Sequence, residues 1–85
     1  MPAKFLVVEK PAKKGLRKLP EHIHIKIVYR LGQIQQNPLS GKRLHGELSG
    51  YYKYRVGDYR IVYRFDSKKS VVVVVKIEHR QGVYK

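Results

Sequence analysis

The cations and tyrosines of residues 49–64 are the part of the chain best suited to chemistry. Five tyrosines are interspersed there with four cations, namely Lys53, Arg55, Arg60 and Arg64. Gly57-Asp58 divides the segment into two short strand patterns. Lys and Arg neutralise phosphate, whereas the planes of Tyr and Arg stack on nucleobases. On a rigid hairpin this pattern indicates a surface for a polyanion that carries stackable rings, and we expect that polyanion to be RNA.

An excess of positive charge runs through the whole chain. The 85 residues include 19 Lys and Arg against 6 Asp and Glu, a formal net charge of +13. Such self-repulsion lowers the stability of an isolated domain, so we expect a polyanionic partner, an acidic protein partner or both. Cysteine is absent from the sequence, which excludes a disulfide framework and a thiolate metal site or nucleophile.

Length and composition predict a single domain over residues 1–85, because 42% hydrophobic residues suffice for one core and not for two. The apolar run at residues 5–8 is far shorter than the ~20 residues of a membrane span. It also differs from the apolar region of a signal peptide. We therefore expect a soluble, cytoplasmic protein that does not contact a membrane.

The first half of the chain predicts one strand followed by two helices. Residues 4–8 are rich in β-branched and aromatic residues, which is typical of a strand. Pro11 suits the first turn of a short helix that ends at Leu19-Pro20. Its apolar face holds Ala12 and Leu16, and Gly15 should weaken it by roughly 1 kcal/mol relative to Ala.

A second helix is predicted from about residue 21 to residue 36. Its apolar stripe comprises Ile23, Ile27, Leu31 and Ile34, with Val28 beside them. Two consecutive amphipathic helices form an antiparallel hairpin whose apolar stripes need a further partner. The partner we expect is a sheet.

The second half predicts that sheet as a meander of strands at about 51–56, 59–65 and 71–78, after a basic connector that contains Lys42 and Arg43. Alternation places Tyr59, Ile61, Tyr63 and Phe65 on a core face, opposite Arg60, Val62 and Arg64. The valine run at 71–75 indicates an inner strand, and residues 4–8 can pair on its free side. We predict an α+β fold of order β-α-α-β-β-β, a small, mostly antiparallel sheet with a helical hairpin packed on one face.

Taken together, these residues resemble the RelE-type toxins of the RelE/ParE superfamily, which belong to prokaryotic toxin–antitoxin pairs. Four segments carry the resemblance: Leu-Arg-Lys-Leu-Pro at 16–20, Asn-Pro-Leu at 37–39 with Gly-Lys-Arg-Leu-His-Gly at 41–46, the tyrosine-rich segment 48–63, and Ile-Glu-His-Arg-Gln-Gly-Val-Tyr at 77–84. The third segment is the most specific, and the His-Arg-x-x-Val-Tyr pattern of the fourth is next.

The resemblance implies a ribosome-dependent endoribonuclease, or mRNA interferase, that cleaves messenger RNA in the decoding site and so inhibits translation. In this family the ribose 2′-hydroxyl attacks the adjacent phosphate, which leaves a cyclic phosphate and a free 5′-hydroxyl. Neither a metal nor another cofactor is implied. The partners implied are the ribosome, mRNA and a cognate antitoxin, which the charge of this chain predicts to be acidic.

The reaction needs a base, positive charge around the phosphate and a proton for the leaving oxygen. By resemblance, Arg60 and Arg80 clamp the phosphate, since guanidinium groups match phosphate oxygens bidentately. Lys53 matches a family lysine and can act as base if Arg55 and Arg60 lower its pKa. Tyr84 matches a C-terminal tyrosine of the family. The candidate catalytic residues are Lys53, Arg60, His79, Arg80 and Tyr84, and the candidate RNA-binding residues are Lys42, Arg43, Arg55 and Arg64.

Other interpretations stay open for several of these residues. Arg64 can equally lie on a solvated strand face, and His79 can be a polar strand end or an acid–base catalyst. Tyr59 and Tyr63 are predicted to be core residues, whereas Tyr51, Tyr52 and Tyr54 are undecided. Because the family places cations at this site, the resemblance argues against Glu47 or Glu78 as the base.

Two alternative functions also remain. One is the ParE-like branch of the superfamily, which inhibits DNA gyrase and generally lacks the basic and tyrosine cluster. The other is a catalytically inactive domain of the same fold that binds RNA or sequesters an antitoxin. Lys53, Arg60, Arg80 and Tyr84 together argue against the first.

Overall fold

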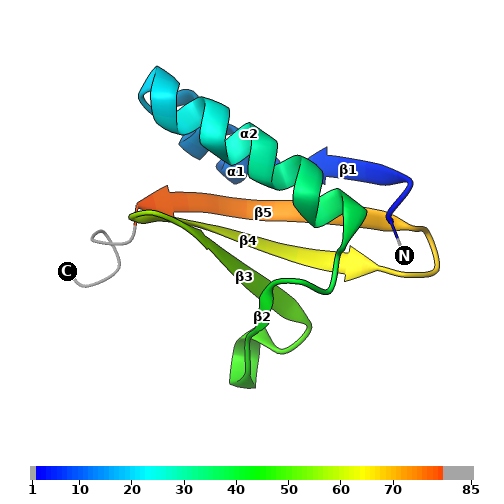
Figure 1. The fold of residues 1–85 in the computed structure, drawn as a ribbon. Coiled ribbons are helices and arrows are strands. Elements are labelled where there is room, and N and C mark those ends of the chain that lie inside the picture. Colours follow the sequence, from blue (N-terminus) through cyan, green and yellow to red (C-terminus); the bar gives the residue numbers. More distant parts are fainter. Residues whose placement is uncertain (1, 80–85) are drawn as a thin grey trace.

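The computed structural model describes residues 2–79, which form a five-stranded sheet with two helices on one side of it (Figure 1). A 3₁₀ turn at Gly46–Leu48 joins the second and third strands. The elements are β1 (Phe5–Val8), α1 (Lys10–Arg17), α2 (Glu21–Gln36), β2 (Lys42–Arg43), β3 (Tyr51–Val56), β4 (Tyr59–Asp66) and β5 (Val71–His79). The predicted α+β class is confirmed. The short strand β2 and the 3₁₀ turn lie in the segment that was predicted to be a connector.

The strands lie in the order β1-β5-β4-β3-β2. β1 pairs with β5 in parallel, and the other three pairings are antiparallel, which confirms both the mostly antiparallel sheet and the pairing of residues 4–8. β5 is an inner strand, as its valines predicted, and Val72, Val73 and Val74 are buried.

Both helices cover the same face of the sheet and close the core. The stripe on α2 is as predicted, with Ile27, Leu31 and Ile34 buried, whereas Val28 is 47% exposed and points away from the core. The stripe packs on sheet residues that include Ile61. In the part of the chain that the structure describes, no helix is long and apolar enough to cross a membrane.

Gly15 has a different role from the one its helix propensity indicated. A Cβ atom built on Gly15 would lie far inside 3.0 Å of the carbonyl oxygen of Ile77, a separation that real Cβ atoms essentially never show. The absence of a side chain therefore lets α1 approach the backbone of β5 closely. In this fold Gly15 is a packing requirement, and not only a weak point of the helix.

Tyr63 anchors the segment after α2 to the centre of the sheet. Its side chain is fully buried and stacks on Tyr52, with ring centroids 5.3 Å apart. The phenol hydroxyl donates to the carbonyl oxygen of Pro38 at 2.8 Å and accepts from the backbone N–H of Gly41 at 3.0 Å. Burial is the main cause that raises the pKa of Tyr63 above its ordinary value. The core prediction for Tyr63 is confirmed, and Tyr52 joins it there.

Candidate functional site

The face of the sheet opposite α2, which we call the open face, carries three rows of side chains across β3, β4 and β5. Strand register and alternation define the rows. The first row is Arg55, Arg60 and Glu78; the second is Lys53, Val62 and Lys76; the third is Tyr51, Arg64 and Val73. The register of β2 adds Lys42 at the edge of the second row. The charged face predicted from the middle strand is therefore real, and it extends over four strands.

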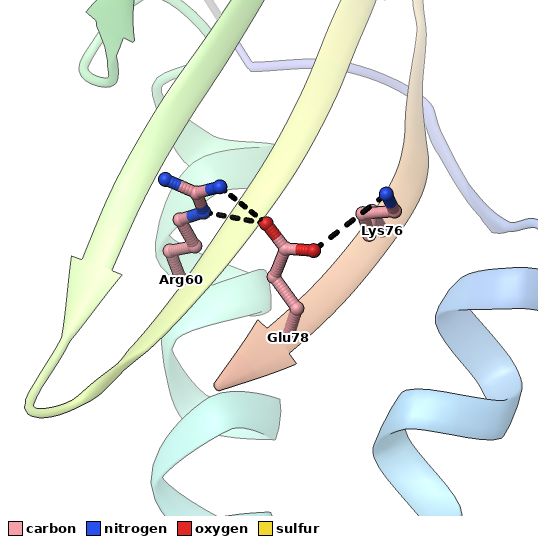
Figure 2. Close-up of polar contacts among 3 residues, drawn as sticks. All are labelled: Arg60, Lys76 and Glu78. Atoms are coloured by element: carbon pink, nitrogen blue, oxygen red, sulfur yellow. Dashed lines mark hydrogen bonds and ion pairs between the residues drawn. The ribbon is translucent and has the colours of Figure 1, made fainter. Parts of the chain in front are cut away.

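Arg60 lies at the centre of the first row and is bound by a carboxylate. Its Nε and Nη2 atoms contact Oε2 of Glu78 at 2.6 and 2.5 Å, and the Nζ of Lys76 lies 3.6 Å from Oε1 (Figure 2). The Arg60 and Glu78 side chains are each 25% exposed, whereas Lys76 is 58% exposed. The pair also offsets the repulsion between Arg60 and Arg55, which face each other directly across β3 and β4.

A hollow of about 390 Å³ opens beside this pair. Lys53, Arg60, Lys76 and Glu78 supply its charged wall. Its apolar wall comes from α1, from the loop around the 3₁₀ turn and from the sheet; the residues are Pro11, Leu44, Leu48, Tyr51, Val62 and Val75. Three cations and one carboxylate beside apolar surface suit a ligand with a phosphate group and a flat ring.

The structure brings most of the predicted site residues to the open face. Lys53 and Arg60 both line the hollow, and Arg55, Arg64 and Lys42 share their face. The register of β2 directs Arg43 to the opposite face, because Arg43 is the partner of Tyr52. Arg43 is therefore not brought together with the other candidate RNA-binding residues.

His79 is also directed away from the hollow. It is the register partner of Tyr59 on the helix-covered face, where the two rings meet edge to face with centroids 4.7 Å apart. It lines a neighbouring hollow against α1, together with Lys14 and Lys18, and Lys76 and Glu78 line both hollows. Arg80 and Tyr84 lie outside the described residues.

A β-bulge determines which residues of β5 face the hollow. Val62 pairs with Lys76 but the next residue, Tyr63, pairs with Val74, so Val75 is an extra residue in β5. Strict alternation from Val74 would direct His79 to the open face. The extra residue reverses the alternation of the side chains that follow it. Lys76 and Glu78 therefore lie on the same face as Arg60, and His79 lies on the other face.

Lys76 and Glu78 line the hollow although neither was among the predicted site residues. Ile77 gave one usable signal: an apolar residue that packs in the core directs its two neighbours in the strand to the other face. The unbroken valine run hid the bulge, because every residue of that run is equally apolar.

Comparison with known proteins gives a consistent set of relatives. A family model described as the ParE toxin of type II toxin–antitoxin system, parDE, matches residues 6–84. Toxin RelG of Mycobacterium tuberculosis is 37% identical over 76 residues, which cover 87% of each chain.

Solved structures agree with the sequence comparison. The toxin–antitoxin complex RelBE2 from Mycobacterium tuberculosis contains a chain with a TM-score of 0.85 and 34% identity, and the match covers 94% of both chains. The isolated toxin RelE from E. coli matches with a TM-score of 0.76 and 26% identity, over 88% of this chain and 82% of that one. The helices on the mixed sheet are thus a fold that these toxins share.

Proposed function

The chain belongs to the ParE toxin family of type II toxin–antitoxin systems, and we propose that it acts as a ribosome-dependent endoribonuclease that cleaves messenger RNA in the decoding site. One observation carries this proposal: Lys53 and Arg60, with Arg55 and Arg64 beside them, share an open face of the sheet next to a hollow. Such a cluster of cations is suited to an RNA backbone. We expect the protein to act in the cytoplasm, where ribosomes are found.

The proposed reaction is attack of a ribose 2′-hydroxyl on the adjacent phosphate. Arg60 and Lys53 stabilise the negative charge that grows on the phosphate oxygens in the transition state. Arg55, Arg64 and Lys42 bind neighbouring phosphates along the same face. We also propose Arg80 and Tyr84 as catalytic residues, by resemblance, and His79 as a further acid–base candidate, whose side chain lies on the other face of the sheet. Arg43 is retained as a candidate contact to RNA away from the hollow.

We further propose that a cognate antitoxin neutralises the toxin. The similar RelBE2 structure is of a toxin bound to its antitoxin. A net charge of +13 favours an acidic partner. Binding of that partner over the open face would cover Arg60 and prevent access of RNA.

Induction in growing cells, followed by mapping of mRNA 5′ ends, tests the proposed activity. We expect growth to stop and cuts to appear within translated mRNA, and purified toxin should cut mRNA only when ribosomes are present. Arg60→Gln should lower the cleavage rate at least 100-fold, because one well-placed electrostatic contact contributes roughly that much. Lys68→Gln is the control, since Lys68 is exposed in the turn at the far end of β4.

Arg80→Ala and Tyr84→Ala test the residues assigned by resemblance alone. Each should lower cleavage by orders of magnitude while the melting temperature stays near that of the wild type. Full toxicity of either variant would show that the site lies elsewhere.

A second candidate function is inhibition of DNA gyrase, and the description of the matching family as ParE toxin favours it. Gyrase supercoiling assays with the purified toxin separate the two functions. Inhibited supercoiling with intact mRNA would establish the gyrase function, and RNA binding without cleavage would establish a catalytically inactive domain.

A further inference from the structure

We propose that Glu78 is the general base of the cleavage reaction, accepting the proton of the attacking 2′-hydroxyl. This inference rests on the proposed endoribonuclease function and adds to it a residue that neither the sequence pattern nor the comparisons assign. It reverses the expectation that the cationic site has no use for a carboxylate.

The position of Glu78 beside Arg60 opposes the binding of a phosphate there. Only 6 of the 85 residues are acidic, and among the described residues Glu78 is the sole carboxylate in the wall of the hollow. A negative charge beside the arginine that binds phosphate repels the phosphate. Glu47, by comparison, is exposed in the 3₁₀ turn and does not line the hollow.

The two carboxylate oxygens of Glu78 have different surroundings. Both contacts from Arg60 go to Oε2, which fixes the orientation of the carboxylate. Oε1 lies 3.6 Å from Lys76, which is beyond hydrogen-bond length. Oε1 therefore keeps lone pairs that can accept a proton from a hydroxyl bound in the hollow.

Arg60 connects this base to the phosphate. It contacts Glu78 through Nε and Nη2, while Nη1 points away from the carboxylate (Figure 2). A phosphate oxygen bound at Nη1 would share one rigid guanidinium plane with Glu78. The guanidinium group of Arg60 would then hold the Glu78 carboxylate next to the phosphorus atom. Attack by the neighbouring 2′-oxygen requires this arrangement.

The step balances with groups that line the hollow. Oε1 of Glu78 takes the proton of the 2′-hydroxyl, and the 2′-oxygen uses the freed electron pair to form a bond to phosphorus. The bond between phosphorus and the 5′-oxygen then breaks. Its electron pair stays on the 5′-oxygen, which takes a proton from the ammonium group of Lys53. The products are a 2′,3′-cyclic phosphate and a 5′-hydroxyl, and water returns both side chains to their starting states.

The test compares Glu78→Gln with Glu78→Asp in single-turnover cleavage of mRNA on programmed ribosomes. Gln keeps an oxygen that can accept from Arg60 but cannot act as a base, so we expect its rate to fall 100- to 10,000-fold. Asp keeps the base and shifts its position, so we expect it to retain more activity than Gln. Melting followed by circular dichroism checks that both variants are folded.

The pH dependence of the rate gives a second measurement. We expect cleavage by the wild type to decline at low pH, because a protonated carboxylate cannot accept the 2′-hydroxyl proton, and we expect this decline to be absent in Glu78→Gln. The charged and titratable groups around Glu78 are Arg60 and Tyr59 on β4, Lys76 and His79 on β5, Lys53 and Tyr51 on β3, and Lys14 and Lys18 on α1.

Different results overturn the two proposals separately. A Glu78→Gln rate within threefold of the wild type, with the low-pH decline intact, would overturn the base and leave Glu78 as a residue that only orients Arg60. Absence of cleavage by the wild type itself would overturn the endoribonuclease function, and with it any role for Glu78 as its base.

Discussion

The close approach of α1 to β5 predicts that one substitution has opposite effects at two glycines. Gly15 of α1 touches the backbone of β5 at Ile77, whereas Gly32 of α2 is exposed and a Cβ there would meet nothing within 4 Å. In an exposed helix position, Gly→Ala stabilises by roughly 0.5–1 kcal/mol. We therefore expect Gly32→Ala to raise the free energy of unfolding by that amount.

Gly15→Ala gains the same helix propensity but must also fit a methyl group against a carbonyl oxygen. Overpacking costs about 1–3 kcal/mol, and the upper end applies because the obstacle is sheet backbone and not the end of a flexible side chain. Subtracting the gain in propensity leaves a net loss of about 2 kcal/mol. For a domain of this size the melting temperature should fall by about 8–16 °C.

Thermal and urea unfolding followed by circular dichroism at 222 nm measures both variants against the wild type. The two alanine variants should differ by about 3 kcal/mol in the free energy of unfolding, with Gly15→Ala the less stable. A Gly15→Ala protein that melts at or above the wild-type temperature would refute the argument, because it would mean that α1 does not need this contact distance.

Two further predictions concern Tyr63. Tyr63→Phe should lower the free energy of unfolding by about 1–3 kcal/mol in a urea titration, since it leaves the N–H of Gly41 and the carbonyl of Pro38 without their partner. The control is Tyr29→Phe, on the exposed side of α2. It should change the free energy of unfolding by less than about 0.5 kcal/mol in the same titration. Burial raises the pKa of Tyr63 in the folded state, so above about pH 10 the unfolded chain loses this proton first and stability should decline as the pH rises. Urea titrations between pH 9 and pH 11 should show a smaller decline for Tyr63→Phe, and an equal decline in both proteins would contradict this linkage.

Periodicity was sufficient to predict most of this fold. The bounds of α2 and the three long strands followed from apolar spacing and from turn residues, because those patterns reflect burial directly. Strand β2 was not predictable in this way, since its two residues, Lys42 and Arg43, are exposed and polar and owe their pairing to β3. The role of Gly15 was hidden for a similar reason: a close backbone contact leaves no pattern in the sequence.

The candidate site was predicted as far as strand alternation could be followed. Lys53, Arg60 and Arg64 share one face because β3 and β4 pair regularly along that stretch. At the bulge in the valine run of β5, the alternation of side chains between the two faces shifts by one residue. All residues of the run are equally apolar, so the sequence does not show where the shift occurs. The choice between Glu78 and His79 as the neighbour of Arg60 therefore needed the register of the two strands.

The parallel pairing of β1 with β5 has a consequence for synthesis of the protein. Phe5 pairs with Val71, so β1 can join the sheet only after the much later strand β5 has been synthesised. Contacts that distant in sequence form late in folding, because a long loop must close first. Glu78 lies near the end of β5 and faces Arg60 only once β5 has docked. A nascent chain in which β5 has not yet docked therefore lacks the complete open face.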